Sequence, residues 1–366
     1  MKILICTPEY PPYTHGIGNV VYNITENFKN LGVDFKICSP VGPDIKIGNH
    51  KIMEKTGILG LTYFSNLVLK YFKNNKFDLG WFNGNYFANN PFENAFVTLH
   101  STYLGFYKNG VNPQLYHKLA SKLERFYLNK INTGNVRFSG VSREVCKELE
   151  LIGISHDDIN YIPNGVDINI FKPSNAKYAL KDKFGIPKEN LVILSIGRLS
   201  EPKRPKKIIE TFSLIEKSIE KVSLIIAGDG DLLKETKELA IKEKLNNVLF
   251  LGKVNYNKVK DLYAVADYFL MTSKYEGQPL TLLEAISSGL PCIVSDIPSL
   301  DIVKEAKCGI IVNFDDSDSI NKIPDYILKN NSNHSKNARK YAVDNLDWKN
   351  VAQNYINQFY KIYENQ

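Results

Sequence analysis

Apolar runs alternate with amphipathic segments along the first half of the chain. An apolar run at residues 3–6 leads into a Pro-rich loop at 8–18. Apolar positions then recur every three or four residues, which predicts a helix, at Ile17, Val20, Val21, Ile24, Phe28 and Leu31. Gly32 ends this helix, and residues 34–38 predict a second strand. The resulting strand–loop–helix–strand unit is typical of the start of a doubly wound sheet.

Further strands of the first half are predicted at 77–82, 95–99 and 136–141, the last one followed by a short helix at 142–151. The second half repeats this alternation. Its helices are predicted at about 205–220 and 232–244, and its five short strands at 191–196, 222–227, 248–251, 268–271 and 292–294. Strands that alternate with helices predict a second parallel sheet with helices on both faces.

The two predicted sheets define two domains. Pro and Gly turn signals between Tyr161 and Ser174 mark the boundary, which gives a first domain at 1–165 and a second at 166–345. A polar stretch at 329–340 precedes a final amphipathic helix with Trp348, Tyr355 and Phe359. The fold class is therefore α/β, with two Rossmann-like domains facing a central cleft. In open α/β sheets, ligands bind at the carboxyl ends of the strands.

Composition narrows the class of protein. The 366 residues are 43% hydrophobic and carry a net charge of +7, which suits an anionic small ligand or an acidic membrane surface. Without a nucleic-acid-binding motif, a charge this small and scattered argues against nucleic acid. The five cysteines form no C-x-x-C pair, so we expect free thiols in a reducing cytoplasm. We expect no signal peptide and no membrane-spanning helix, and therefore a cytoplasmic protein.

Two loops after predicted strands carry candidates for anion binding. The loop at 11–18 contains Gly16; small residues let the backbone approach an anion, and the next helix start supplies free N–H groups. The loop at 197–203 contains Arg198 and Lys203, which suit a diphosphate as a planar fork and a point charge. The cations that follow Lys203 suggest a solvated helix start, at Arg204, Lys206 and Lys207. A plain turn and a basic surface loop remain the alternatives.

The strongest pattern is EGQPLTLLE at 276–284. Glu276 falls on a loop after a strand, where a carboxylate can accept hydrogen bonds from sugar hydroxyls. Glu284 falls one turn into a helix, where it can accept from a ribose diol while the N–H groups of Leu280 and Thr281 meet phosphate. The alternative for Glu284 is a capping box with Thr281. His100, just past an apolar strand, is either structural or a site residue.

These segments together resemble the retaining glycosyltransferases of family 4, the group 1 glycosyltransferases of the GT-B fold. They occur in the family's order and span nearly the whole chain: PPYTHGIG (11–18), TLH (98–100), GVS (140–142), IPNGVD (162–167), IGRLSEPK (196–203), IIAGDG (225–230), FLGKV (250–254), EGQPLTLLEAISSGLP (276–291) and SD (295–296).

The resemblance implies roles in binding a nucleotide-sugar donor. Gly16 matches a glycine that contacts the donor phosphates, and Val254 a residue beside the nucleobase. Leu280 and Thr281 match backbone phosphate donors, and Glu284 matches the ribose-binding glutamate.

The resemblance also implies the catalytic groups. Arg198 and Lys203 match two cations that hold the diphosphate leaving group, and Glu276 matches the glutamate that contacts the transferred sugar. His100 matches the histidine that touches this sugar near the reacting face. The final helix, 346–366, resembles the segment that crosses back onto the first domain.

The function implied is a retaining, metal-independent transfer of a hexose of mannose, glucose, galactose or GlcNAc type from a UDP- or GDP-sugar. The acceptor would be a glycan or glycolipid in cell-surface polysaccharide or glycoconjugate biosynthesis. Fixed cations and helix N–H groups can stabilise the departing diphosphate in place of a metal ion. Since no residue is a convincing covalent nucleophile, the mechanism predicted is a front-face step of oxocarbenium character.

Other functions remain open at this point. Asp229-Gly-Asp231 and Asp316-Ser-Asp318 could serve a metal-dependent transferase, although that class leaves the Arg198 and Glu276 segments unexplained. A sugar-nucleotide epimerase of similar fold would act without an acceptor. A non-catalytic sugar-nucleotide-binding scaffold subunit would need none of the catalytic groups. A dehydrogenase is disfavoured because no G-x-G-x-x-G follows the first strand.

Residues 58–76 raise a separate hypothesis. Apolar Leu59, Tyr63, Leu67 and Tyr71 are followed by Lys70, Lys73 and Lys76. Such a segment predicts either a helix that packs in the core or an interfacial helix that touches a lipid-linked acceptor. The second alternative would place the protein peripherally on the inner face of the membrane.

Overall fold

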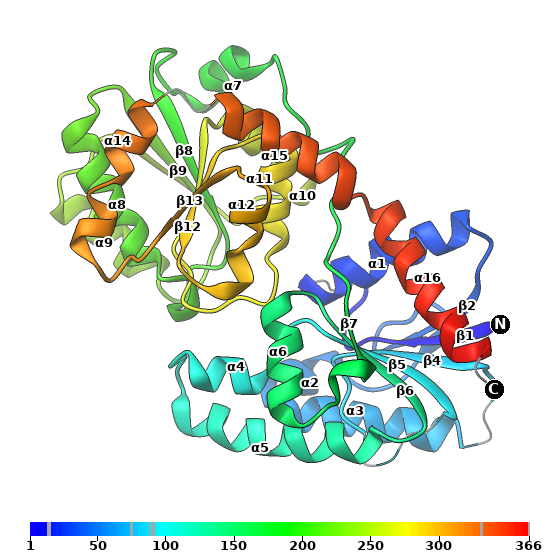
Figure 1. Cartoon of the computed structure of the whole chain (residues 1–366). Coiled ribbons are helices and arrows are strands. Elements are labelled where there is room, and N and C mark those ends of the chain that lie inside the picture. Colours follow the sequence, from blue (N-terminus) through cyan, green and yellow to red (C-terminus); the bar gives the residue numbers. More distant parts are fainter. Residues whose placement is uncertain (13–15, 74–75, 88, 90–91, 330–331, 365–366) are drawn as a thin grey trace. The chain divides into compact units, whose positions relative to one another are not determined.

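The computed structural model describes residues 1–12, 16–73, 76–87, 89, 92–329 and 332–364 (Figure 1). The chain divides into two compact units, Met1–Gly165 with Trp348–Gln366, and Val166–Asp347. The predicted second domain ended at 345, two residues short of this division. Leu346 and Asp347 stay with the second unit because Val166 pairs with Asp347 and donates its N–H to the Leu346 carbonyl at 2.7 Å.

The sheet of the first unit is parallel and has the strand order β3-β2-β1-β4-β5-β6-β7. Its strands are β1 (Lys2–Cys6), β2 (Asp34–Ser39), β3 (Ile45–Lys46), β4 (Leu79–Asn83), β5 (Asn94–Leu99), β6 (Asn135–Gly140) and β7 (Ile159–Tyr161). The central strands β1, β4 and β5 are apolar runs buried on both faces, as expected for a covered parallel sheet.

Helices cover both faces of this sheet (Figure 1). One face carries α1 (Gly16–Asn30) and α16 (Trp348–Glu364), which pack on each other. The other face carries α2 (His50–Thr56), α3 (Ile58–Tyr71), α4 (Tyr103–Lys108), α5 (Gln114–Ile131) and α6 (Arg143–Ile152). A short 3-10 helix, His156–Asp158, precedes β7.

Aromatic packing attaches α16 to the first unit. Tyr355 and Phe359 are buried, and their ring centroids lie 4.8 and 5.7 Å from that of Trp81 in β4. Phe359 also contacts Phe96 of β5 and Phe28 of α1. The final helix therefore completes the core of the first unit, although the whole second unit, Val166–Asp347, lies between it and β7 in the sequence.

The second unit is also a parallel sheet, with the order β10-β9-β8-β11-β12-β13. Its strands are β8 (Leu191–Ile196), β9 (Val222–Ala227), β10 (Val248–Gly252), β11 (Tyr268–Met271), β12 (Cys292–Ser295) and β13 (Gly309–Val312). The prediction of five strands was wrong because it omitted β13. This edge strand begins with glycine, and three of its four residues are only half-buried.

Two apolar cores lie on the two faces of this second sheet. One contains side chains from α10 (Tyr256–Val265), α11 (Leu280–Ser287), α12 (Ile302–Glu305) and α15 (Ser332–Asn345). The other contains side chains from α8 (Pro205–Ser218), α9 (Leu233–Lys242) and α14 (Ile323–Leu328). Short helices α7 (Lys177–Phe184) and α13 (Ser317–Ile320), and 3-10 turns at Glu201–Lys203 and Pro298–Leu300, complete the unit.

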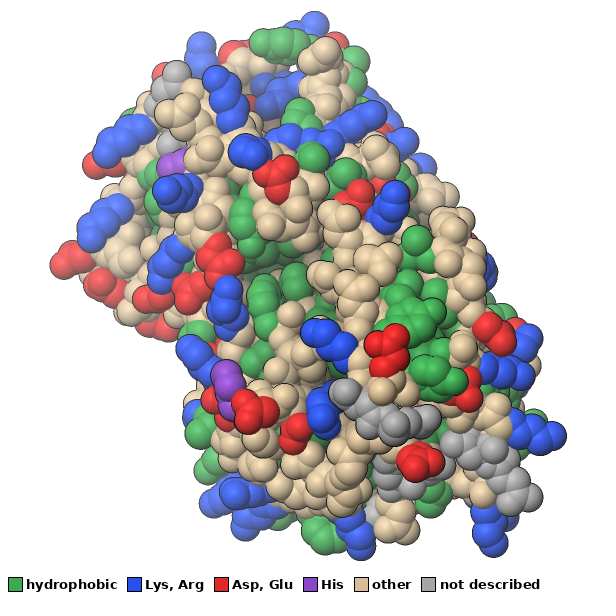
Figure 2. Space-filling view, turned by 45° about the vertical axis from the view of Figure 1, so that its right-hand side comes forward, with side chains coloured by type: hydrophobic (Ala, Val, Ile, Leu, Met, Phe, Trp, Pro, Cys, Tyr) green, Lys and Arg blue, Asp and Glu red, His purple; other side chains and the backbone are tan. Residues whose placement is uncertain are grey.

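Charge is mixed over the visible surface. Figure 2 shows basic and acidic side chains interspersed on the face in view, without one field of a single sign. None of the helices in the described ranges combines the length and the apolar character needed to cross a bilayer.

Candidate functional site

The strand order of the second unit reverses between β8 and β11. β8 pairs with β9 on one side and with β11 on the other. The chain continues from β8 to β9 in one direction and from β11 to β12 in the other. A crevice at the carboxyl ends of such strands is where open α/β sheets bind ligands. The loops that leave these two strands contain Arg198 and Lys203 after β8, and Glu276 after β11. The switch point therefore brings these three predicted residues to one edge of one sheet.

A glycine turn after β9 holds the Arg198 loop in place. Gly197 donates its N–H to the Ala227 carbonyl at 3.0 Å, and Leu199 donates to the Asp229 carbonyl at 2.9 Å. Gly228 and Gly230 have φ values of 146° and 154°. A Cβ at Gly228 would lie 1.8 Å from the Gly197 carbonyl oxygen, so only glycine fits there. The backbone of Asp229 thus positions the loop, which gives the first D-x-D a structural role.

The Arg198 side chain is exposed and makes no hydrogen bond or ion pair with any residue that the structure describes. The cations after it differ. Arg204 forms a two-bond pair with Asp315 at 2.7 and 3.0 Å. Lys206 pairs with Glu235 and Lys207 with Glu210, at 2.5 and 2.8 Å. The three cations stand at the start of α8, where each pairs with a nearby carboxylate. Among the described residues, the Arg198 side chain has no such partner.

Lys203 is paired with the candidate sugar-binding carboxylate. Its Nζ donates to Glu276 Oε1, which also accepts the Ser273 hydroxyl at 2.6 Å. Glu276 is buried, and its Oε2 has no partner among the described side chains. The Thr272 hydroxyl donates to the Lys203 or Arg204 carbonyl, at 3.0 and 3.1 Å. These contacts hold the two loops together and leave one carboxylate oxygen able to accept from a hydroxyl group.

Glu284 is buried on α11 and faces Tyr263 of α10. The Tyr263 hydroxyl donates to Glu284 Oε2 at 2.7 Å and lies 3.1 Å from the Thr281 carbonyl. Burial raises the pKa of Glu284 to about 7, and the hydrogen bond from Tyr263 opposes this rise. The capping-box alternative is wrong, because the helix begins after Pro279 and Glu284 bonds to Tyr263.

Leu280 and Thr281 are the first two residues of α11. The acceptor of the Leu282 and Leu283 N–H groups is the Pro279 carbonyl, so the N–H groups of the first two residues have no acceptor within the helix. Val254 follows β10 and packs against the core on the α11 face of the sheet. Gly228 donates its N–H to the Gly252 carbonyl at 2.8 Å, which joins the loop before Val254 to the Arg198 loop.

Gly16 of the first unit begins α1, and a Cβ there would meet no atom of the described residues within 4 Å. Gly18 donates its N–H to Glu9 Oε2 at 3.4 Å, so one N-terminal donor of α1 already faces a carboxylate. Residues 13–15 of the same segment lie outside the described residues.

His100 directly follows β5. Its Nε2 lies 3.3 Å from Asn83 Oδ1, and Asn83 in turn donates Nδ2 to the Cys6 carbonyl at 3.5 Å. Because Nδ2 faces that carbonyl, Oδ1 faces the imidazole, which makes Nε2 the protonated nitrogen. Burial lowers the pKa of His100 to about 4. The ring is therefore neutral near pH 7, with Nδ1 able to accept a hydrogen bond.

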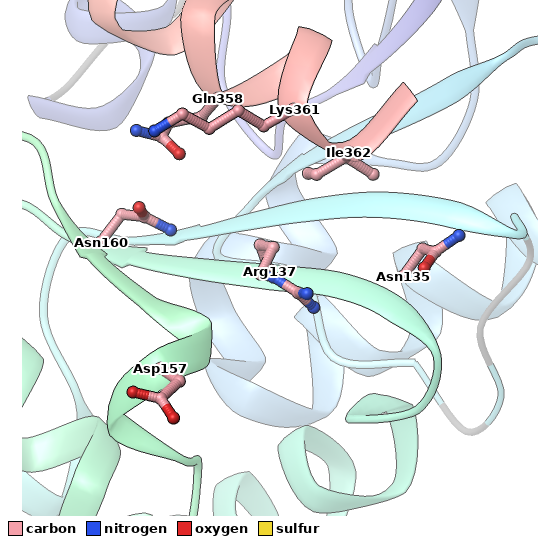
Figure 3. Close-up of a pocket in the computed structure, with 7 residues that line it drawn as sticks. All are labelled: Asn135, Arg137, Asp157, Asn160, Gln358, Lys361 and Ile362. Carbon is pink, nitrogen blue, oxygen red and sulfur yellow. The ribbon is translucent and has the colours of Figure 1, made fainter. Parts of the chain in front are cut away.

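Another hollow in the first unit contains none of the predicted site residues. Asn135 and Arg137 line it from β6, Asp157 and Asn160 from the segment through β7, and Gln358, Lys361 and Ile362 from α16 (Figure 3). Arg137 is already paired with Asp158 at 3.2 Å. The candidate site residues therefore lie on the loops that follow the strands and not in this hollow.

Several functional residues escape sequence reasoning. Tyr263, Ser273 and Asn83 each hold a predicted site residue, but each is 3 to 21 positions away from it. No local pattern identifies such partners. Gly228 and Gly230 could have been found, because the GDG turn belongs to the segments of the family resemblance.

Two family models match the chain, one over most of each unit. A family model described as "Glycosyltransferase Family 4" matches residues 14–170, and one described as "Glycosyl transferases group 1" matches residues 177–344.

Two curated relatives are informative. The Escherichia coli UDP-Gal:alpha-D-GlcNAc-diphosphoundecaprenol alpha-1,3-galactosyltransferase is 34% identical over 217 residues, 55% of this chain and 53% of the relative. The chain thus matches about half the length of this relative. The Acholeplasma laidlawii alpha-monoglucosyldiacylglycerol synthase is 26% identical over 86% of this chain and 85% of its own length.

Among solved structures, Anabaena HepE in complex with UDP-glucose superposes with a TM-score of 0.74 at 17% identity. The match covers the whole of both chains, so the similarity extends to the complete two-unit fold.

Proposed function

Because the chain belongs to the group 1 glycosyltransferases of the GT-B fold, we propose that it is a hexosyltransferase that uses a nucleotide-sugar donor. The observation that carries this proposal is the switch point of the second unit. There Arg198, which has no side-chain partner among the described residues, lies beside the linked Lys203 and Glu276 and the start of α11 with Glu284. This set can take a diphosphate, a sugar hydroxyl and a ribose diol.

The proposed reaction breaks the bond between the anomeric carbon and the diphosphate oxygen, and the electron pair leaves with the diphosphate. Arg198, Lys203 and the free N–H groups of α11 stabilise this developing negative charge, which a metal ion does in other transferases. An acceptor hydroxyl then bonds to the same face of the anomeric carbon, and its proton passes to the departing diphosphate. The configuration is retained.

Glu276 and His100 have proposed roles at the sugar. Glu276 Oε2 is free to accept from a hydroxyl group of the transferred hexose, while Oε1 is held by Lys203 and Ser273. His100 is proposed to contact the same hexose as a neutral acceptor through Nδ1. The role of His100 rests on the family resemblance and on the tautomer that Asn83 selects.

The donor and acceptor classes follow the similar proteins. HepE is solved with UDP-glucose, and the name of the E. coli relative specifies UDP-Gal, a lipid-linked acceptor and an alpha linkage. The Acholeplasma relative is named for a glucosylated diacylglycerol. We therefore propose a UDP-hexose donor, with a GDP-hexose as the alternative. The proposed acceptor is a glycan or glycolipid of cell-surface glycoconjugate biosynthesis.

A thermal-shift screen in EDTA tests the donor site. UDP, GDP, ADP and their hexose conjugates are added to the full chain, and a ligand that binds only the folded state raises the melting temperature. We expect a rise with UDP and UDP-hexoses without added metal. If no nucleotide gives a rise, the donor site proposed here is overturned for these donor classes. A rise without transfer to any acceptor would instead indicate a non-catalytic sugar-nucleotide-binding scaffold subunit. A donor converted to an isomer without acceptor would identify an epimerase.

Donor affinity should depend on pH through Glu284. Ribose hydroxyls favour the carboxylate form, whereas burial of Glu284 raises its pKa to about 7. The Kd for UDP-glucose should therefore rise by up to about tenfold per pH unit as the pH falls below 7, and stay constant above it. Each phosphate of UDP-glucose has one ester bond and one anhydride bond, so neither keeps a second, weakly acidic hydroxyl that would titrate near pH 7.

Calorimetric titrations between about pH 5.5 and 8.5 would measure this dependence. Glu284→Gln supplies the control, because its amide cannot titrate; its Kd should be higher at pH 8 and nearly independent of pH. An equal slope in Glu284→Gln would assign the titration to another group.

A further inference from the structure

The outer face of α5 exposes a row of large apolar side chains. Leu115, Leu119, Leu123 and Phe126 are 71%, 54%, 36% and 56% exposed. At 3.6 residues per turn, these four positions fall within roughly 80° of the helix circumference, so they form one continuous stripe. The inner face of the same helix packs Ala120, Leu128 and Ile131 into the core. The exposed stripe is therefore a second apolar face, and the core of the unit does not use it.

Cations border this stripe. Lys118, Lys122, Arg125 and Lys130 are exposed and have no ion-pair partner among the described residues. Lys118, Lys122 and Arg125 occupy an adjacent arc of roughly 60°, and Lys130 lies over the ring of Phe126 at 5.6 Å. The outer face thus presents four unpaired positive charges beside its apolar side chains.

The one acidic residue of α5 faces inward. Glu124 is buried and accepts the Tyr86 hydroxyl at 2.9 Å and the N–H groups of Tyr103 and Leu104 at 3.1 Å each. No negative charge of α5 therefore reaches its outer face. An anionic partner surface would meet attraction along the whole length of the helix.

The neighbouring helix α3 extends this surface. α3 and α5 lie on the same face of the sheet and contact each other (Figure 1). Leu59, Tyr63 and Tyr71 of α3 are exposed, whereas Phe64 and Val68 are buried. Three of the four apolar residues singled out in the segment 58–76 thus lie outside the core, which decides against the core-packing alternative for them.

We propose that the outer face of α5, together with the exposed residues of α3, docks the protein onto a bilayer that contains anionic lipid. Leucine and aromatic side chains would enter the interface between headgroups and acyl chains, and the lysines and arginine would contact lipid phosphates. Charge complementarity selects this occupant, because the apolar stripe carries unpaired cations and no acid. The inference does not depend on the proposed transferase activity.

Vesicle sedimentation of the full chain tests the docking face. With vesicles of phosphatidylcholine and phosphatidylglycerol we expect co-sedimentation that weakens with salt, and with phosphatidylcholine alone little binding. Leu119→Gln with Phe126→Gln should lower the partition coefficient at least tenfold. Lys118→Glu with Lys122→Glu should lower it at least about 25-fold, since each cation contributes about fivefold. All four side chains are exposed, so the variants should fold.

A matched control comes from α9 of the second unit. Ile241 is exposed there and Lys242 follows it; Ile241→Gln with Lys242→Glu should leave vesicle binding unchanged. Absence of binding to anionic vesicles at low salt, or equal binding by all variants, would overturn the proposal. A lipid-free dimer that Leu119→Gln with Phe126→Gln converts to a monomer would instead make this face a contact between two copies. None of these measurements needs donor or acceptor, so either proposal can fail alone.

Discussion

Replacing Arg198 with alanine is expected to lower kcat/KM for hexose transfer by about 10²–10³-fold. The reason is the imbalance of charge in its loop. Lys203 is compensated by Glu276, and Arg204 by Asp315, whereas the Arg198 guanidinium has no partner among the described residues. Removing it takes away the one uncompensated cation of this loop that can face a departing diphosphate.

The Arg198 prediction is checked by initial rates of transfer with a donor identified in the thermal-shift screen. Arg198→Lys should recover part of the loss, because it restores the charge but not the planar fork. Lys206→Ala is a suitable control, since Lys206 lies on the same segment but is exposed and paired with Glu235. If Arg198→Ala retained wild-type kcat/KM, the charge stabilisation would have to come from elsewhere.

Replacing Phe359 with alanine is expected to lower the free energy of unfolding of the first unit by about 3–5 kcal/mol. Phe359 is fully buried, and its ring contacts Phe28, Trp81 and Phe96 from one helix and two strands. Alanine would leave a cavity among rigid aromatic rings, which cannot collapse easily.

Urea unfolding followed by tryptophan fluorescence is suited to this test. The two tryptophans, Trp81 and Trp348, both belong to the first unit, so the signal reports that unit alone. Tyr360→Ala is the control, because this neighbour on α16 is exposed and should change stability by less than about 0.5 kcal/mol. A loss below about 1 kcal/mol for Phe359→Ala would mean that α16 contributes little to the core.

Fully buried strands were predictable from the sequence. The predicted bounds of β8, β9 and β11 agree with the structure, because each is an apolar run buried on both faces and bounded by polar residues. Helix α15 was missed. Only Ala338 and Ala342 are buried in it, and it is held by Arg339, which donates to the carbonyls of Ile168, Phe171 and Ser287. Because so few apolar side chains of α15 are buried, its sequence lacks the apolar periodicity that predicts a helix.

The candidate site likewise has a part that the sequence predicts and a part that it does not. Spacing and strand ends singled out Arg198, Lys203, Glu276 and Glu284 as candidates, because chemistry-bearing side chains after strands form a local pattern. Their partners depend on tertiary contacts between distant segments, such as Lys203 with Glu276. The sequence therefore indicated which residues to examine, but not that Lys203 pairs with Glu276 while the Arg198 side chain has no partner in the described part of the chain.

The placement of α16 has a consequence for biosynthesis. A ribosome makes β1 through β7 first and then the whole second unit, residues 166–347, before it reaches Trp348. Until α16 emerges, the aromatic face formed by Phe28, Trp81 and Phe96 has no cover. The second unit can fold during translation, since its sheet and both of its cores are contained within its own residues. The nascent first unit keeps an exposed aromatic surface until α16 is synthesised, and chaperones recognise surfaces of this kind.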